Sequence, residues 1–494
     1  MRKLLIPIAV LLLTACSAGI PSEFTESGQD PVIFPDYTGV TVPSNIAPLN
    51  FHIGMESDDF ITVISAAQED LALRGQDVRI PEKAWHRMLG SGKVSVRIFL
   101  KENGSWKACN SFDISAAEDI DPYISYRLIP PSVESYERLT ISQRDLTSFK
   151  EKVIYANSMV QDGSDGQCIN CHHYRNYRTD AMQFHARQYL GGTVMLFEGQ
   201  LRKLNLKTDS TISAGVYPAW HPTHDYIAYS TNKTHQSIHM ADHNRIEVLD
   251  EESDLILYDI RRNTVSTIEN DSSQFECYPA WAPDGRTLYY VSAFYDGPFD
   301  RNRKDRVFLA ADDIRYSLYA KPFNPETRAW GPTQTVYDAA ADSMSATLPR
   351  ISPDGRWLMF SLGRQGVFHI WHKDADLCMM DLRDGSWRRL DEINSPDVES
   401  YHSWSSNGRW IIFSTRREDG AFTRLYIAHM DNDGKFSKPF ALPQEDPGHN
   451  RSFMYSYNIP EFMVEPVKVP ARRFAAFIRS SQAQSVGFES KITE

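Results

Sequence analysis

Residues 278–294 read YPAWAPDGRTLYYVSAF, and three further stretches of the chain repeat this pattern. Each stretch begins with an aromatic or apolar residue, has Trp or Ile three positions later, makes a turn of the Pro-Asp-Gly kind and ends in an apolar strand. The other copies are YPAWHPTHDYIAYSTNK from Tyr217, LPRISPDGRWLMFSLGR from Leu348 and YHSWSSNGRWIIFSTRR from Tyr401. Repeats of this kind indicate small sheets arranged side by side, because one such sheet cannot bury both of its faces alone.

The spacing of the repeats predicts four-stranded units closed into a ring. The Trp or Ile positions 220, 281, 351 and 404 lie 61, 70 and 53 residues apart, which allows four strands per unit with insertions. Asp-Gly supplies the tight hairpin turn in each unit. Strands from Gly192 and the stretch FMYSYNIPEF from Phe453 are incomplete units that together close the ring. We therefore expect five blades, or six if another element contributes.

These repeats resemble the PD40 repeat of TolB-like β-propellers. The resemblance covers about 270 residues and implies the fold, whereas propellers host many unrelated functions. The Trp, Tyr and Phe residues of the repeats are therefore interpreted as core packing and not as a binding site.

The N-terminus predicts export with a lipid anchor. Arg2 and Lys3 precede an apolar run from Leu4 to Leu13, which is too short to span a bilayer as a helix. The sequence Leu-Thr-Ala-Cys that follows resembles the lipobox of bacterial lipoproteins, in which Cys16 is acylated and becomes the new N-terminus. Lipid chains of this kind anchor a protein to a membrane without a spanning helix. The default expectation is an outer-membrane anchor facing the periplasm.

Composition narrows the classes of partner. The 494 residues contain 52 basic and 64 acidic side chains, and this acidic balance argues against nucleic acid as a partner. Six cysteines are too few for a disulfide scaffold. If Cys16 carries lipid, we interpret Cys109, Cys277 and Cys378 as small buried apolar residues.

The stretch GQCINCHHY, residues 166–174, carries the strongest chemical signal. A Cys-x-x-Cys pair in an exported protein can form a disulfide, half of a zinc site or a haem anchor. Zinc needs two more ligands nearby, and no other cysteine lies within about fifty residues. A redox pair normally opens a helix in a βαβ setting, which is not predicted here.

Cys168, Cys171 and His172 fit the c-type haem attachment motif. In that motif the two thiols bind the two vinyl groups of the haem, and the histidine that follows is the proximal iron ligand. We therefore expect one covalently bound haem c. For the sixth ligand, His185 is favoured, with His239, Met182 and Met195 as alternatives and an open or water-ligated site as a further one.

The sequence thus predicts a mainly β protein. The expected regions are a lipoprotein signal peptide (1–15), a tether (16–45), a β-sandwich-like domain (46–150), a short haem c-binding segment (151–190), a five- or six-bladed TolB-like β-propeller (191–465) and a C-terminal tail (466–494).

Three hypotheses of function follow from these features. The first is an electron-transfer lipoprotein whose haem is packed against the propeller and serves a redox partner that the sequence does not identify. The second is a haem-propeller oxidoreductase with a site at the propeller mouth, near the charged runs Asp242 to Asp254 and Asp296 to Asp313. The third is a TolB-like interaction platform of the envelope with a structural or sensing haem.

Overall fold

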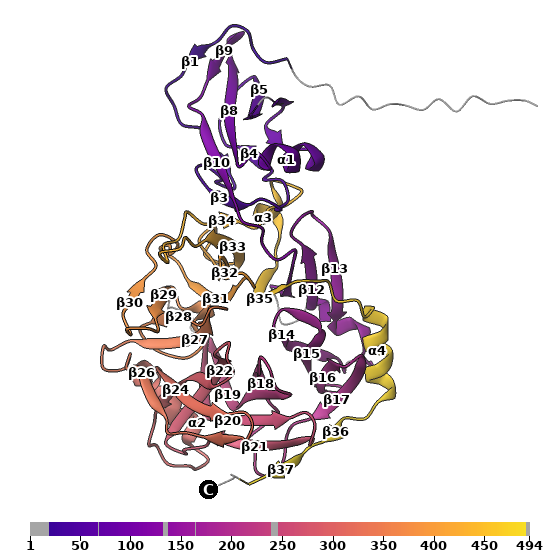
Figure 1. The fold of residues 1–494 in the computed structure, drawn as a ribbon, viewed down its shortest axis with the longest axis vertical. Coiled ribbons are helices and arrows are strands. Elements are labelled where there is room, and N and C mark those ends of the chain that lie inside the picture. Colours follow the sequence, from indigo (N-terminus) through magenta and orange to yellow (C-terminus); the bar gives the residue numbers. More distant parts are fainter. Residues whose placement is uncertain (1–18, 68, 132–136, 164, 239–245, 491–494) are drawn as a thin grey trace, which may run out of the picture.

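The computed structural model describes residues 19–67, 69–131, 137–163, 165–238 and 246–490. It contains an N-terminal β domain and a ring of β-sheets, in which one parallel bridge between β20 (Ile246–Asp259) and β22 (Gln274–Trp281) joins the sheets of two neighbouring blades (Figure 1). Within these ranges no helix is long and apolar enough to cross a membrane. Cys16 and His239 lie outside the described residues, so the lipid anchor and one alternative iron ligand stay predictions.

The ring is a six-bladed β-propeller. The inner strands of neighbouring blades contact one another all the way round. From the axis outward the blades are: blade 1, β35 (Ser456–Met463), β11 (Tyr123–Ile129), β12 (Thr140–Asp145), β13 (Glu151–Ala156); blade 2, β14 (Gln167–Arg175), β15 (Arg178–Gln188), β16 (Gly192–Phe197), β17 (Gln200–Asn205); blade 3, β18 (Val216–Trp220), β19 (Tyr226–Ile238), β20 (Ile246–Asp259), β21 (Thr264–Glu269); blade 4, β22 (Gln274–Trp281), β23 (Thr287–Phe294), β24 (Ser317–Asn324), β26 (Gln334–Tyr337); blade 5, β27 (Ser345–Ile351), β28 (Trp357–Gly363), β29 (Asp376–Asp381), β30 (Trp387–Arg389); blade 6, β31 (Glu399–Trp404), β32 (Trp410–Thr415), β33 (Arg424–His429), β34 (Phe440–Ala441).

The turn predicted from Asp-Gly joins the first two strands of blades 4 and 5. Gly285 and Gly355 have φ of +69° and +75°, a left-handed conformation that glycine adopts without strain. Asp284 Oδ1 accepts a hydrogen bond of 2.8 Å from the Arg286 amide, and Asp354 Oδ1 accepts one of 3.0 Å from the Arg356 amide. Each carboxylate therefore fixes its own turn, as expected for an Asp-turn.

Apolar side chains fill the spaces between neighbouring blades. Blades 3 and 4, for example, bury Leu255 and Ala219 against Trp281 and Leu288. Separate clusters of the same kind lie between blades 1 and 2, 2 and 3, 4 and 5, and 5 and 6. The tryptophans of the repeats, Trp220, Trp281 and Trp404, are core residues, as the sequence predicted. The tyrosines that begin three repeats, Tyr217, Tyr278 and Tyr401, differ from this expectation because they line a pocket at the axis.

The ring closes through a strand taken from the far end of the chain. Strand β35 pairs with β11 in antiparallel register, with Tyr123 opposite Met463 and Ile129 opposite Ser456. Blade 1 therefore consists of three strands from residues 123–156 and one from residues 456–463. This pairing joins the two ends of the propeller and explains why the repeat from Phe453 lacks a second half.

The boundaries expected from sequence differ from the observed ones. Strands β11–β13 belong to the propeller and not to a domain ending at residue 150, because they pair with β35. Residues 151–190 do not form a separate segment, since they make β13, β14 and β15. The expected tether also contributes strands, because β1 (Thr25–Glu26), β2 (Ile33–Phe34) and β3 (Thr41–Pro43) each pair with the N-terminal domain.

The N-terminal domain has a seven-stranded and a three-stranded sheet and one helix. Its remaining elements are β4 (Phe51–Ile53), β5 (Asp59–Ala66), β6 (Glu69–Arg74), β7 (Asp77–Val78), α1 (Glu82–Leu89), β8 (Lys93–Glu102), β9 (Ser105–Ala108) and β10 (Phe112–Ala117). Its core continues into the propeller, because Trp85 and Phe51 belong to the same apolar cluster as Trp410 of blade 6 and Tyr126 of blade 1.

The C-terminal residues run along the outside of the ring. Helix α4 (Ala471–Ser480) packs Phe474 and Ile478 into the core between blades 1 and 2. Strand β36 (Gln484–Ser485) then pairs with β17, and β37 (Gly487–Glu489) pairs with β21. The expected tail is therefore a strap that covers the outer edges of blades 2 and 3. The other short elements are β25 (Ala329–Trp330), α2 (Arg303–Leu309), α3 (His449–Ser452) and the 3₁₀ turns 157–159, 311–313 and 369–371.

Candidate functional site at the propeller axis

All six inner strands contain the same irregularity at the axis. In each strand the pairing register with its neighbour shifts by one residue at the start of a four-residue pattern. The first residue of the pattern has φ between +49° and +56° in five blades: Cys171, Tyr217, Tyr278, Leu348 and Ile459. This bulge turns the first side chain of each pattern toward the axis.

The cysteine motif is one copy of this pattern. Residues 171–174 (Cys-His-His-Tyr) occupy in blade 2 the place of Tyr-Pro-Ala-Trp in blades 3 and 4. Sequence reasoning missed this correspondence, although Tyr174 stands three positions after Cys171 as Trp281 does after Tyr278. The motif therefore lies on the innermost strand of a blade and not on a linker.

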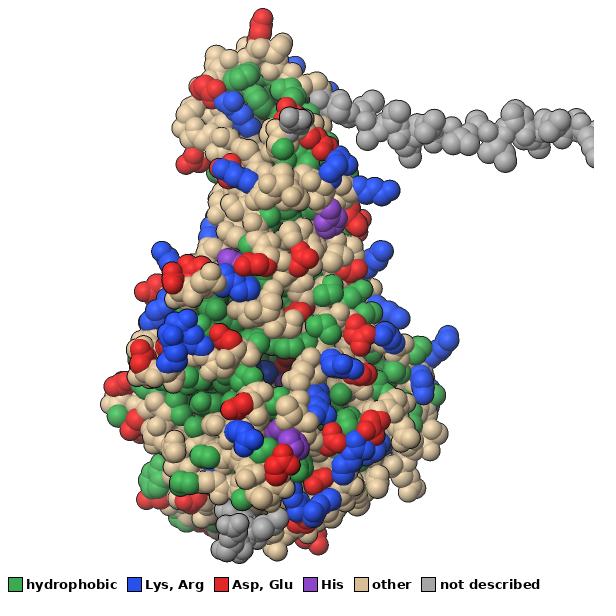
Figure 2. Space-filling model, viewed as in Figure 1, with side chains coloured by type: hydrophobic (Ala, Val, Ile, Leu, Met, Phe, Trp, Pro, Cys, Tyr) green, Lys and Arg blue, Asp and Glu red, His purple; other side chains and the backbone are tan. Residues whose placement is uncertain are grey.

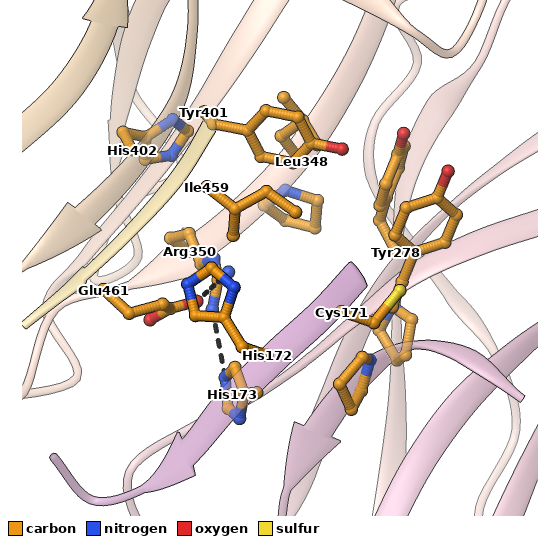
Figure 3. Close-up of a pocket in the computed structure, with 14 residues that line it drawn as sticks. Cys171, His172, His173, Tyr278, Leu348, Arg350, Tyr401, His402, Ile459 and Glu461 are labelled. Atoms are coloured by element: carbon orange, nitrogen blue, oxygen red, sulfur yellow. Dashed lines mark hydrogen bonds and ion pairs between the residues drawn. The ribbon is translucent and has the colours of Figure 1, made fainter. Parts of the chain in front are cut away.

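The six patterns line a pocket on the axis, which we call the chamber. Its walls come from every blade and are formed by Cys171, His172, His173, Tyr217, Pro218, Tyr278, Pro279, Leu348, Pro349, Arg350, Tyr401, His402, Ile459 and Glu461. Figure 3 shows His172 on one side of this space, with Tyr278 and Tyr401 across from it. The lining combines apolar side chains with histidines, tyrosines and the Arg350–Glu461 pair, a combination that suits a small molecule or cofactor.

His172 is buried without a hydrogen-bond partner. Its side chain is 1% exposed, and neither Nδ1 nor Nε2 has a partner. The carbonyl of Ile459 lies beside the ring without completing a hydrogen bond. Burial lowers the pKa of His172 to about 4, so the imidazole is neutral at physiological pH. A neutral imidazole with free nitrogens is a good ligand for iron or another transition metal.

The two cysteines of the motif are free thiols near a buried guanidinium. Cys171 is buried at the chamber wall, and Cys168 is half-buried three residues earlier on β14. The charged and titratable neighbours of Arg127, on β11, include Cys168, Cys171 and Tyr401. Burial lowers the pKa of Arg127, and its Nε has no hydrogen-bond partner. A buried cation with few partners favours an anionic group at this end of the chamber.

The predicted sixth ligands that the structure describes do not line the chamber. His185 lies on β15, one strand away from the axis, where its Nδ1 is 3.0 Å from Thr193 Oγ1. Met182 packs in the core between blades 1 and 2, and Met195 packs between blades 2 and 3. His185 is expected from sequence because the residues that separate it from His172 are enough to reach round a haem. These residues instead form the hairpin of β14 and β15, which holds His185 one strand away from the axis.

An ion pair separates the chamber from a wider mouth. Arg350 donates a hydrogen bond of 2.8 Å to Glu461 Oε1 and one of 3.3 Å to His173 Nε2 (Figure 3). These three residues line both the chamber and a larger cavity on the side of the Pro-Asp-Gly turns, which we call the mouth. Sequence reasoning assigned no role to Arg350 or Glu461, because they stand at core positions of the repeat.

The remaining cysteines and several histidines have structural places. Cys109, Cys277 and Cys378 are buried free thiols, as predicted. His221 Nε2 lies 2.9 Å from the Gly285 carbonyl oxygen and joins blades 3 and 4. Across the described ranges, no three His, Cys, Asp or Glu side chains are grouped as a metal site. The visible face of the propeller carries interspersed acidic and basic side chains (Figure 2).

Comparison with known proteins gives similarity of overall structure only. No family model and no curated protein matches the sequence. Similar solved structures include TolB from Acinetobacter baumannii (14% identity, 74% of this chain and 78% of that chain, TM-score 0.42) and a Synechocystis apocarotenoid oxygenase mutant (11%, 86% and 95%, 0.38). Another is a puromycin-hydrolyzing peptidase of Mycobacterium tuberculosis (12%, 86% and 57%, 0.36). The propeller assignment rests on the strand pairing described above and not on these low scores.

Proposed function

We propose that this chain is an exported, lipid-anchored c-type cytochrome that transfers electrons through one haem held in the axial chamber. The observation that carries the proposal is the buried His172 ring, which has two free nitrogens and directly follows the free thiol of Cys171. Leaving such a group without a partner is costly unless a ligand satisfies it.

The residues at the axis fit a haem in their chemistry. Cys168 and Cys171 would hold it covalently, and His172 would supply the proximal imidazole. Arg127 would stabilise its anionic propionate groups, since burial already disfavours its charge and its Nε has no hydrogen-bond partner among the described residues. Leu348, Ile459 and the prolines of the chamber would exclude water. When bound, the haem supplies reversible one-electron transfer between its ferric and ferrous states.

The roles of the remaining elements follow from this placement. The propeller would form the wall around the haem, and the N-terminal domain, whose core continues into blade 6, would connect the ring to the membrane tether. Acylation at Cys16 would anchor the protein in the cell envelope. The expected position is the outer membrane, with the protein on its periplasmic side. Partitioning of the full-length protein and of a Cys16→Ser variant between detergent and aqueous phases tests the anchor.

The decisive experiment compares intact masses. The protein is produced in a host that matures c-type cytochromes, and the Cys168→Ser/Cys171→Ser variant is compared with the wild type. We expect the wild type to carry the mass of one haem that survives denaturation and the double variant to carry none. Cys277→Ser is the matched control, because Cys277 is a buried thiol directly before Tyr278 on the inner strand of blade 4. An unmodified wild-type mass would refute the proposal.

A second candidate function is an oxidoreductase with its site at the propeller mouth, on the side of the Pro-Asp-Gly turns; none of the described residues of the charged runs 242–254 and 296–313 lines this cavity. The observation that favours it is the mouth cavity, which adjoins the chamber through Arg350, Glu461 and His173. These three residues would separate a small substrate in the mouth from the chamber. Substrate-dependent reoxidation of the reduced protein that is lost in Arg350→Met would favour this candidate over simple electron transfer.

A further inference from the structure

Three tyrosines reach the axial chamber from three different blades. Tyr217, Tyr278 and Tyr401 are the first residues of their four-residue patterns, the place that Cys171 has in blade 2. The rings of Tyr217 and Tyr278 are 4.4 Å apart between centroids, and Tyr278 and Tyr401 interact through their phenol groups. The phenols therefore form one cluster on the wall of the chamber.

These phenols are hydrogen-bond donors in an apolar setting. Burial raises the pKa of all three, so they stay protonated at physiological pH. Leu348 and Ile459 complete the same wall with apolar side chains. A donor cluster surrounded by apolar groups favours a small ligand that accepts hydrogen bonds.

Among the described residues that line the chamber, the imidazoles other than His172 are His173 and His402. His173 directly follows His172 on β14; its Nε2 accepts a hydrogen bond from Arg350, its Nδ1 has no partner, and the residue also lines the mouth. The ring nitrogens of His402 lie 2.9 Å from the Ser400 carbonyl oxygen and 3.3 Å from the Met359 carbonyl oxygen. His402 is thus held between the backbones of blades 5 and 6.

We propose that the chamber opposite His172 is a binding pocket for a small exogenous iron ligand, such as a diatomic molecule or a triatomic anion, whose free end is hydrogen-bonded by the Tyr217, Tyr278 and Tyr401 phenols. This inference rests on the haem proposed above. It adds that none of the described residues that line the chamber occupies the sixth position, and that the tyrosines, as positioning residues, set which ligands bind.

The test uses azide and carbon monoxide with the purified holoprotein. Azide binds an open ferric site and accepts hydrogen bonds strongly, whereas carbon monoxide binds the open site after dithionite reduces the iron to the ferrous state and accepts hydrogen bonds weakly. We expect both to change the visible spectrum of the wild type. Tyr401→Phe and Tyr278→Phe should each weaken azide binding roughly tenfold, the effect of one lost hydrogen bond. Carbon monoxide binding should change less than about threefold in the same variants.

The matched control is Tyr290→Phe. Tyr290 is a buried tyrosine of blade 4 whose hydroxyl bonds Glu269 at 3.1 Å, away from the chamber. The Tyr290→Phe substitution should leave the affinities for azide and for carbon monoxide unchanged. Two results would overturn the inference: a haem that binds neither probe, which would indicate a sixth ligand from the protein, or azide binding that ignores Tyr401→Phe and Tyr278→Phe. The pyridine haemochrome of the same samples shows separately whether haem is present, so loss of the haem itself is distinguished from loss of the pocket.

Discussion

Strands β14 and β22 have the same place in their blades and the same bulge at the axis, yet they carry different chemistry. Blade 4 has Tyr278-Pro279 at the bulge, and blade 2 has Cys171-His172. In blade 4 the pattern ends in Trp281, which packs between blades and donates a hydrogen bond to the Ala219 carbonyl oxygen at 3.1 Å. In blade 2 the corresponding Tyr174 is equally buried, but its hydroxyl has no partner.

This difference separates what the repeat needs from what the chain adds. Five blades hold a proline or a backbone-bonded histidine after the bulge, and both satisfy the local structure by themselves. Only blade 2 places there an imidazole without a hydrogen-bond partner, next to a free thiol. The propeller backbone therefore supplies the positions, and blade 2 supplies reactive groups at two of them.

The largest effect is expected when His172 of blade 2 is replaced by the proline that most other blades have at this place. Proline stands after the bulge in blades 1, 3, 4 and 5. When both proteins are produced without haem, the His172→Pro variant should therefore have a free energy of unfolding in urea within about 1 kcal/mol of the wild-type value. The same change should abolish the spectrum of an imidazole-ligated haem. A variant that keeps this spectrum would show that His172 is not the proximal ligand.

The next largest effect is expected in blade 4. Trp281→Ala removes a side chain that is 9% exposed and fills the core between blades 3 and 4, so unfolding free energy should fall by about 3–5 kcal/mol. The spectrum of any bound haem should be unchanged, because Trp281 does not line the chamber. A loss below about 1 kcal/mol in urea denaturation would contradict the packing role assigned to the repeat aromatics.

A smaller effect concerns His402, which follows the bulge in blade 6 as His172 does in blade 2. Burial lowers the pKa of His402 to about 4, below its ordinary value of 6.5. Between about pH 6.5 and pH 4 the His402 side chain binds a proton in the unfolded chain but not in the folded protein. The free energy of unfolding therefore falls as the pH falls through this range. His402→Gln should remove up to about 3 kcal/mol of this pH dependence in denaturation measured across that window. An unchanged slope would mean that His402 is protonated in the fold.

The smallest effects are expected at the Asp-Gly turn, which occurs in both blade 4 and blade 5. Gly355→Ala should cost about 1 kcal/mol in thermal or urea unfolding, because a side chain at φ +75° is strained but meets only open space and Pro283 at 3.8 Å. Gly285→Ala should cost more, since its Cβ would lie 2.3 Å from His221 Cε1. Equal losses would contradict the close packing of blades 3 and 4 around His221.

The sequence predicted the propeller because its repeats carry both a turn signal and an aromatic core signal. It did not predict blade 1, because β11 to β13 lack the four-residue pattern and take their inner strand from residues 456–463. The sequence left the blade count between five and six because Cys-His-His-Tyr has only its aromatic last residue in common with Tyr-Pro-Ala-Trp and was not recognised as a copy of the pattern.

Within the site, Cys168, Cys171 and His172 could be proposed from spacing alone, since the attachment motif is local in sequence. The partners of these residues could not. Arg127, Tyr278 and Tyr401 lie 40 to more than 200 residues away and reach the axis only because the ring closes. Each also stands in a strand pattern that reads as ordinary core.

The central claim is that blade 2 presents a haem-binding strand at the axis, and the pyridine haemochrome spectrum of the purified wild-type protein tests it most directly. Expressed with haem c maturation, the protein should give the reduced α-band of a covalently attached haem after denaturation, at one haem per chain. A spectrum without this band, from protein that is folded and produced under the same conditions as a control cytochrome, would contradict the claim.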